Sequence, residues 1–307
     1  MTINRSLAGK RKNLQARARI IQEIRRFFNE GGYLEVETPL RIPAPAPETH
    51  IDAIPSGNWF LHTSPELCMK LLLAAGYERI FQICRCWREG ERGARHLPEF
   101  TMLEWYRANC DYNGLMQECE DLVRSVAHAT GHESALATRG KMIDLSTPWA
   151  KVSVREAFRR YTNVTMEEAL ERDLFDELMV EAIEPRLGTD KPTFIHDYPA
   201  SRGALARLKE GDPTVAERFE LYIGGVELAN AFSELTDPAE QRARFLLERG
   251  NRLSHGKSVY PLPDKFLAEL SHIPAAAGIA LGLDRLVMIF LDASAIDEVV
   301  FFTPEEL

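Results

Sequence analysis

A dense group of ionisable side chains lies between two apolar segments in the first third of the chain. The segments, residues 80–87 and 98–106, have the length and composition of β-strands. The connecting loop 88–97 contains Arg88, Glu89, Glu91, Arg92, Arg95 and His96, and it is longer than an ordinary hairpin loop. Because a guanidinium pairs with phosphate oxygens and keeps its charge, this loop suits a polyphosphate ligand. A solvated charged loop is the alternative.

Three glutamates follow one another at a spacing of seven residues later in the chain, at positions 220, 227 and 234. Residues 217–232 are typical of two strands joined at a Gly224-Gly225 turn, which would make Glu220 and Glu227 cross-strand neighbours. Two adjacent carboxylates repel unless a cation lies between them, and oxygen ligands suit magnesium. Carboxylates that face solvent are the alternative.

A third candidate region joins a strand of small residues, 277–282, to an apolar helix, 284–289. Gly282 would allow a ligand or backbone to approach closely. Arg285, at the start of the apolar helix, requires an anionic or aromatic partner. The region lacks GxGxxG spacing after a first strand, so a Rossmann nucleotide site is not supported.

The elements that position these residues can be predicted from periodicity and caps. Apolar positions predict a helix over 14–28, ended by Gly31-Gly32 and followed by a strand at 33–38 in the string GYLEVETP. A strand at 59–62 precedes a helix with Ser64 as N-cap and Pro65 in the first position. Glu66 lies in its first turn, and helix capping alone would explain that carboxylate.

The middle of the chain gives weaker signals. We expect a helix over 114–127, an irregular stretch over 131–151, and a strand over 193–198. Ser153 with Glu156, and Thr165 with Glu168, are capping-box patterns. The acidic residues within 167–184 are interpreted as the solvated side of helices, without chemistry.

Composition limits the class of protein. The chain has 307 residues, of which 45% are hydrophobic and 27% charged, as in soluble globular proteins. We expect a cytoplasmic protein with no membrane span, since no long apolar run or apolar signal core is present. Five cysteines without regular spacing, including Cys84 and Cys86 on one strand, predict no disulfide framework and are interpreted as structural or incidental. The net charge of −9 disfavours binding to an RNA backbone.

Three strings occur in order: GYLEVETP, the arginine loop with HLPEFTMLEWY, and GIALGLDR. Together they resemble the signature motifs of class II aminoacyl-tRNA synthetases, and TSPE, EFTMLEWY and ELANAFSEL are similar to the lysyl type. The resemblance implies an α+β fold: one catalytic domain over residues 1–307, with an antiparallel sheet flanked by helices and a homodimer formed through the first helix. That helix starts too early to leave room for an N-terminal OB-fold. In this the chain resembles a truncated lysyl-type family, the elongation factor P beta-lysine ligases.

The resemblance implies an ATP-dependent ligase. It would activate (R)-beta-lysine or lysine as the aminoacyl-adenylate and transfer it to a lysine side chain of elongation factor P, with tRNA an unlikely acceptor. Two alternatives remain open: a free-standing lysyl-type enzyme acting on tRNA or a small molecule, and a non-catalytic regulator. Loss of Arg88, Arg285 or the glutamate pair would favour the regulator, but all of them are present.

Residue roles follow from the same resemblance. Arg88 would hold the α-phosphate, and Arg95 and His96 would hold the outer phosphates. Phe100 and Arg285 would lie on the two faces of adenine, and Arg285 would also reach the γ-phosphate. Magnesium would be held by Glu220 and Glu227. Glu66 would bind the amino group near the substrate carboxylate, and Glu234 with Tyr106 the distal ammonium. The remaining contacts would be Glu89, Gly90, Leu97, Leu228 and Gly282 for ATP, and Ser64, Pro65, Asn230 and Ala280 for the amino acid.

Several positions depart from the lysyl pattern. Arg88-Glu89-Gly90 replaces the usual Arg-Asn-Glu, so Glu89 or Glu91 would have to supply the missing glutamate contact. Leu97 replaces an asparagine, which leaves only its backbone for a ligand. Ala231 replaces a usual glycine. Ala280 is glycine in lysyl-tRNA synthetases and alanine in the ligases, and one methyl group would alter a closely packed pocket.

Overall fold

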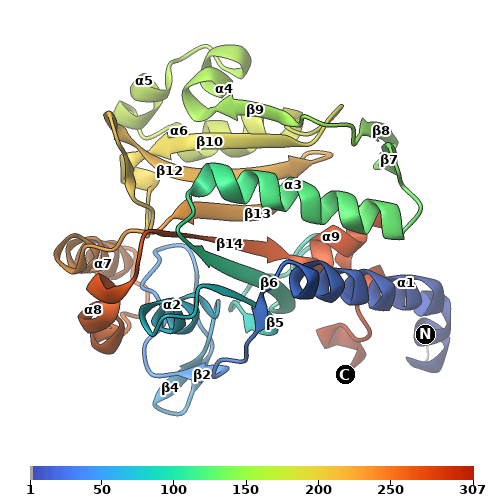
Figure 1. Ribbon diagram of the computed structural model, residues 1–307, viewed down its shortest axis with the longest axis horizontal. Coiled ribbons are helices and arrows are strands. Elements are labelled where there is room, and N and C mark those ends of the chain that lie inside the picture. The colour runs from blue at the N-terminus through green and yellow to red at the C-terminus, as the bar shows by residue number, and fades with distance from the viewer. Residues whose placement is uncertain (1–2) are drawn as a thin grey trace.

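The computed structural model describes residues 3–307 and is built around one nine-stranded sheet (Figure 1). Across the sheet the strands are β1 (Leu34–Glu35), β5 (Arg79–Trp87), β6 (Glu99–Ala108), β14 (Ala276–Gly282), β13 (Val226–Ser233), β12 (Asp212–Ile223), β10 (Thr193–Pro199) and β9 (Ala150–Ser153), with β11 (Leu208–Lys209) beside β12. The central strands from β5 to β10 pair antiparallel, and only the outer pairs β1–β5 and β9–β10 are parallel. The predicted antiparallel sheet is therefore confirmed.

Helices cover the sheet and flank its ends (Figure 1). They are α1 (Ile3–Glu30), α2 (Glu66–Ala74), α3 (Tyr112–Ala129), α4 (Val154–Tyr161), α5 (Met166–Glu171), α6 (Phe175–Leu178), α7 (Pro238–Ser254), α8 (Asp264–Glu269) and α9 (Leu283–Phe290). Two small sheets complete the fold: β2 (Arg41–Ile42), β4 (Trp59–Leu61) and β3 (Pro55–Ser56) form one, and β7 (Ala135–Thr138) and β8 (Lys141–Asp144) the other. Helices together with an antiparallel sheet make this an α+β fold.

Strand alternation gives the two faces of the sheet different characters. One face is apolar: Phe81, Leu103, Ile279, Ala231 and Phe219 join the main core, to which α1 and α3 contribute their buried side chains. On the other face, the register places Gln82, Glu104, Ala280, Asn230 and Glu220 opposite one another on five successive strands. A one-residue slip would exchange the faces, so the apolar core fixes the position of this polar row.

A buried ion pair connects the first helix, α1, to α9 and β6. Arg17 of α1 lies 2.5 Å from Asp284 at the start of α9, and both side chains are almost completely buried. The other oxygen of Asp284 accepts from the backbone N–H of Thr101, and Arg17 also donates to the Thr101 hydroxyl. Because Thr101 follows Phe100 and Asp284 precedes Arg285, the pair positions two predicted ATP contacts.

Several sequence expectations need correction. The first helix begins at Ile3 rather than at residue 14, and the second arm of the arginine hairpin begins at Glu99 rather than at Pro98. Pro65, not Ser64, is the N-cap of α2, although the Ser64 hydroxyl still accepts from the Glu66 N–H. The stretch 131–151 is not irregular, because it contains the β7–β8 hairpin and the start of β9.

Other local predictions are confirmed. Gly224 and Gly225 form a two-residue turn with φ of 62° and 72°, values that glycine adopts without strain. Ser153 caps α4, and Thr165 with Glu168 forms a complete capping box. Within residues 3–307, no helix combines the length and the apolar character needed to cross a membrane.

Replacing Arg17 with methionine would leave the Asp284 carboxylate buried without its cation. We expect a loss of about 3–5 kcal/mol in the free energy of unfolding, measured by denaturant titration. Arg19 lies on the exposed side of the same helix, so Arg19→Met is the matched control and should change stability by less than about 0.5 kcal/mol. Equal effects of the two substitutions would contradict a special role for Arg17.

Candidate active site

Arg285 joins the arginine loop to the central sheet. Its Nη1 donates to the Glu227 backbone oxygen at 3.0 Å and to the Glu227 carboxylate at 3.3 Å. Its Nη2 lies 2.5 Å from His96 Nε2, and its Nε donates to the Arg95 carbonyl at 3.3 Å. Burial and the Arg285 charge both lower the pKa of His96. The anionic partner expected for Arg285 is thus Glu227, and the loop, β13 and α9 meet at this guanidinium.

Arg88 lies where β5 enters the loop, over the ring of Phe100 at 5.1 Å from its centroid. Its closest carboxylate, on Glu91, is 3.8 Å away. Its buried Nε has no hydrogen-bond partner among residues 3–307. Since an unpaired buried donor is costly, the geometry suits an anionic ligand that completes the hydrogen bonding of Arg88.

Further cations gather beyond the loop in a hollow between the β7–β8 hairpin and the Gly224-Gly225 turn. Arg95, Arg139 and Lys141 line it together with Glu184. Burial lowers the pKa of Arg95, and the neighbouring charges of Arg139 and Arg285 lower it further. Cations that repel one another in this way favour a polyanion. Arg139 and Lys141 were missed because their hairpin was predicted to be irregular.

Glu220 and Glu227 lie on adjacent strands but are not direct cross-strand partners, which corrects the prediction. The two-residue turn pairs Ile223 with Val226 and Tyr222 with Glu227, and a register shift between Leu221 and Tyr222 then pairs Glu220 with Asn230. The two carboxylates are still electrostatically coupled, since burial and then the charge of Glu227 raise the pKa of Glu220.

A third carboxylate belongs to this group. The pKa of Glu184 is raised to about 7, first by burial and then by Glu220 and Glu227. Glu184 lies at the end of the acidic stretch that was interpreted as the solvated side of helices, and this residue is instead partly buried. Three mutually repelling carboxylates form a set of oxygen donors that a hard cation would stabilise.

A second group of charges lies on the polar face of the sheet, beside α2. Lys70 Nζ lies 2.6 Å from Glu66 and 2.5 Å from Glu234, and the Lys70 and Glu234 side chains are each only 1% exposed. Oε1 of Glu234 has no hydrogen-bond partner within residues 3–307. Burial raises the pKa of Glu234 to about 8, although Lys70 opposes that shift.

Glu104 is the third carboxylate of this second group. It accepts hydrogen bonds from Ser64 Oγ at 2.5 Å and from the Tyr106 hydroxyl at 2.8 Å. Burial, and then the charge of Glu66, raise its pKa to about 8. Glu104 was missed at the sequence level, although strand alternation within EFTMLEWY places it on the same face as Tyr106.

Two small residues of β14 lie beside this group of carboxylates. A Cβ on Gly278 would lie 2.1 Å from the Tyr106 ring and 2.6 Å from Glu234 Oε1, so only glycine fits between them. Ala280 lies directly between Glu104 and Asn230 in the polar row. Gly278 and Ala280 therefore lie among the carboxylates, and Gly278 allows Tyr106 and Glu234 to pack closely against β14.

The other predicted ATP contacts differ in their exposure, and one further residue of the site was not predicted. Glu89 and Gly90 are exposed, and Gly282 has no chain atom closer than 3.6 Å to the position of an added Cβ. The side chains of Leu97 and Leu228 are buried in the core, so only their backbones can face a ligand. Arg218 was missed: it donates to Asn230 and Glu220 and thereby fixes both side chains of the polar row.

Glu48 was also missed, because it lies in the proline-rich loop that the sequence did not connect to the site. Burial, and then the charge of Glu66, raise its pKa to about 7, while Arg88 and Arg218 oppose the shift. Glu48 therefore lies within electrostatic range of the guanidinium groups of Arg88 and Arg218 and of the carboxylate of Glu66.

The fold, the arginine loop and the acidic pocket define a class II synthetase catalytic domain. The family model for class II tRNA synthetases of the D, K and N type matches residues 5–306, and the chain belongs to that family. Among curated relatives, the elongation factor P–(R)-beta-lysine ligase of Klebsiella pneumoniae is 40% identical over 307 residues, covering 95% of this chain and 94% of that protein. The proteins with the same name in Salmonella gallinarum and Salmonella dublin are also 40% identical, with the same coverage. The chain is therefore an ATP-dependent ligase.

Two glycines on β14 provide a matched pair of substitutions. Gly278→Ala would force the new methyl into the Tyr106 ring, and we expect it to lower the free energy of unfolding by about 1–3 kcal/mol. Gly282→Ala meets no chain atom closer than 3.6 Å and should leave thermal stability unchanged. Thermal unfolding of both variants tests this difference, and a stable Gly278→Ala protein would contradict the described packing.

Proposed function

We propose that this chain activates (R)-beta-lysine or lysine with ATP and transfers the aminoacyl group to a lysine side chain of elongation factor P. The names of the relatives support this substrate and acceptor. One structural observation carries the proposal independently: the carboxylate pocket has more negative than positive groups. Lys70 pairs with Glu66 and Glu234, while Glu104 lies within electrostatic range of Glu66 and has hydrogen bonds from Ser64 and Tyr106 but no paired cation among residues 3–307.

The charge count selects the substrate class. With all three carboxylates ionised, one lysine leaves two negative charges uncompensated. Buried carboxylates without cations are unfavourable, and here this raises the pKa values of Glu104 and Glu234. An amino acid with two ammonium groups would supply the missing charges, whereas one with a single ammonium would leave one carboxylate unpaired.

Within the pocket we assign the residues as follows. Glu66 binds the ammonium near the substrate carboxylate, while Glu234 and the Tyr106 hydroxyl bind the distal one. Ser64 and Tyr106 hold Glu104 in position. Ala280 and Asn230 form the wall against the carbon chain, and Pro65 holds the loop before α2.

The first chemical step takes place at the α-phosphate of ATP. The substrate carboxylate attacks the α-phosphorus of ATP, forming the acyl–phosphate bond of the adenylate and breaking the bond to pyrophosphate. Arg88 holds the α-phosphate and stabilises its developing charge, which is a fixed electrostatic contribution to the transition state. Arg95 and His96 bind the outer phosphates, and we add Arg139 and Lys141 to this group because they line the same hollow.

Adenine would stack between Phe100 and Arg285, and the backbone around Glu89, Gly90, Leu97, Leu228 and Gly282 would complete the ATP site. Arg88 already lies over the Phe100 ring, so the ring and the α-phosphate cation are held together. In the second step the neutral amine of the acceptor lysine attacks the adenylate carbonyl and displaces AMP.

The residues near the outer phosphates fit magnesium. Glu220 Oε2 accepts from both Tyr198 and Tyr222, whereas Oε1 accepts only from Arg218 and keeps one lone pair. That oxygen and the carboxylate of Glu227 would hold the ion, with Glu184 nearby. Magnesium would supply charge neutralisation of the phosphates.

The acceptor class, the cellular compartment, the oligomeric state and the domain organisation belong to the same proposal. The net charge of −9 fits a protein acceptor better than tRNA. We propose that the protein acts in the cytoplasm as a homodimer through α1, and that residues 1–307 form one catalytic domain.

The first test measures which amino acid supports ATP–pyrophosphate exchange, and then which acceptor receives the label. We expect exchange with (R)-beta-lysine or lysine, none with norleucine, and transfer to elongation factor P. Transfer to bulk tRNA would assign the chain to the free-standing synthetases. Absence of exchange with any amino acid would contradict catalysis itself.

The raised pKa values predict a pH dependence. Below a pH of about 8, Glu104 and Glu234 are largely protonated in the free enzyme, so a dication must displace protons to bind. We therefore expect the KM for the amino acid to fall as the pH rises from about 6.5 to about 8.5, by about tenfold per unit for each carboxylate that must ionise. The KM for ATP, measured in the same assays, should change little. A flat amino-acid KM over this range would contradict the charge argument.

A further inference from the structure

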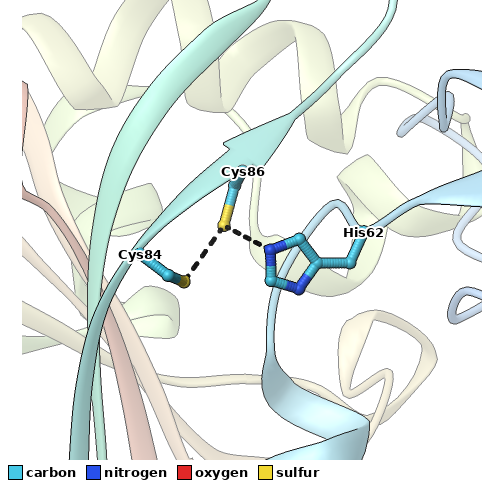
Figure 2. A group of neighbouring side chains, drawn as sticks. All are labelled: His62, Cys84 and Cys86. Carbon is cyan, nitrogen blue, oxygen red and sulfur yellow. Dashed lines mark hydrogen bonds between the residues drawn. The ribbon is translucent and has the colours of Figure 1, made fainter. Parts of the chain in front are cut away.

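Two thiols and an imidazole meet on the ligand-facing side of β5, a combination that neither the ATP nor the amino-acid assignment uses. Figure 2 shows Cys84 and Cys86 projecting from the same strand, with the ring of His62 beside Cys86. The two sulfur atoms are 4.0 Å apart, and Cys86 Sγ is 4.0 Å from His62 Nε2. Within residues 3–307, this is the one group of three histidine, cysteine or carboxylate side chains whose donor atoms all lie within 4.8 Å of one another.

The backbone fixes this arrangement before any ligand arrives. Cys84 and Cys86 are two residues apart on an extended strand, so their side chains share a face. The N–H of Trp87 donates to the His62 carbonyl at 3.0 Å, and the His62 N–H donates to the Leu40 carbonyl at 2.9 Å. The end of β4 is therefore held beside the end of β5, which keeps the imidazole next to the sulfurs.

The spacing suits a shared metal ion better than a disulfide. A tetrahedral zinc ion with Zn–S bonds of about 2.3 Å separates two sulfur ligands by about 3.8 Å, and a sulfur from an imidazole nitrogen by about 3.6 Å. The observed separations are close to both values. Cysteines two apart on one strand have Cα atoms about 6.6 Å apart, near the upper limit for a disulfide, so bridging them would require the strand to distort.

We propose that His62, Cys84 and Cys86 bind a thiophilic divalent ion of the zinc class, with solvent in the fourth coordination position. His62 and Cys86 are buried, whereas Cys84 is partly exposed and leaves a side of the site open. Three protein ligands with one open position are typical of zinc sites that exchange a ligand. No electron is transferred: each sulfur binds as a thiolate, and any proton it carried passes to solvent.

The imidazole must change its hydrogen bond to bind. His62 Nε2 lies 2.7 Å from the Arg85 carbonyl, which can only accept, so this nitrogen carries the ring proton. Coordination through Nε2 moves that proton to Nδ1 and releases the Arg85 carbonyl. Because His62 lies two residues before Ser64, and Cys86 two residues before Arg88, the bound ion would connect the amino-acid loop to the strand that carries the α-phosphate cation.

Cobalt titration tests the site without relying on enzyme activity. Reduced, metal-free full-length protein is titrated with Co2+ without oxygen, and thiolate-to-cobalt charge-transfer absorption is recorded with the visible bands of tetrahedral cobalt. We expect one equivalent to bind and one equivalent of Zn2+ to remove both signals, while Mg2+ has no effect. Cys84→Ser and Cys86→Ser should each weaken binding by at least about tenfold. Cys110→Ser, which changes a cysteine outside the cluster, should bind as the unchanged protein does.

Two results would overturn the proposal. One is cobalt binding that survives in the Cys84→Ser/Cys86→Ser protein, and the other is binding without charge-transfer absorption. If the serine variants fail to fold, X-ray absorption of the zinc-loaded, unchanged protein decides instead. It should show two sulfur neighbours at about 2.3 Å with nitrogen or oxygen completing the shell. A shell of nitrogen and oxygen alone would exclude the thiol site.

Discussion

The close placement of three carboxylates, of which Glu66 and Glu234 are paired with Lys70, is the interaction on which the amino-acid site depends. Glu66, Glu104 and Glu234 come from different elements, α2, β6 and the residue after β13, and Lys70 compensates only part of their charge. In a low-dielectric site such an excess of negative charge is unfavourable, which raises the pKa values of Glu104 and Glu234. The same excess becomes favourable when a ligand brings two ammonium groups. The pocket therefore has the electrostatic complement of its proposed substrate built into the fold.

The sheet makes this charge arrangement possible. Its apolar face carries the main core, and that core fixes the register of five strands. The register in turn aligns the polar row from Gln82 to Glu220, with the small residue Ala280 at its centre. Arg17, Asp284 and Thr101 connect the same framework to Phe100 and Arg285. Stability and ligand recognition are thus joined through shared strands.

Much of this architecture could be predicted from the sequence. The arginine hairpin, the double-glycine turn and the strand–helix junction at Gly282 are local features, and their apolar patterns determined their structures. The ordered motifs led to the correct family. The long first helix and the β7–β8 hairpin were harder, because their periodicity is weak and tertiary packing decides their extent.

Pairwise chemistry between distant segments was the part that sequence reasoning could not provide. The pairing of Glu220 with Asn230 depends on a register shift between Leu221 and Tyr222, which no residue pattern predicts, whereas the pairing of Tyr222 with Glu227 follows from the two-residue turn. Lys70, Glu48, Glu184 and the His62 cluster gained their significance from neighbours far away in the chain. Glu104 is different, since strand alternation alone would have placed it beside Tyr106.

The most direct test of the charge account is the number of protons released when the amino acid binds. Calorimetric titration of the enzyme with (R)-beta-lysine at pH 7, repeated in buffers of different ionisation enthalpy, gives that number. Because Glu104 and Glu234 have pKa values of about 8 in the free protein, we predict the release of about one to two protons per bound molecule. Binding with no net proton release would show that the carboxylates are already ionised in the free pocket, and would contradict the central role given to their burial.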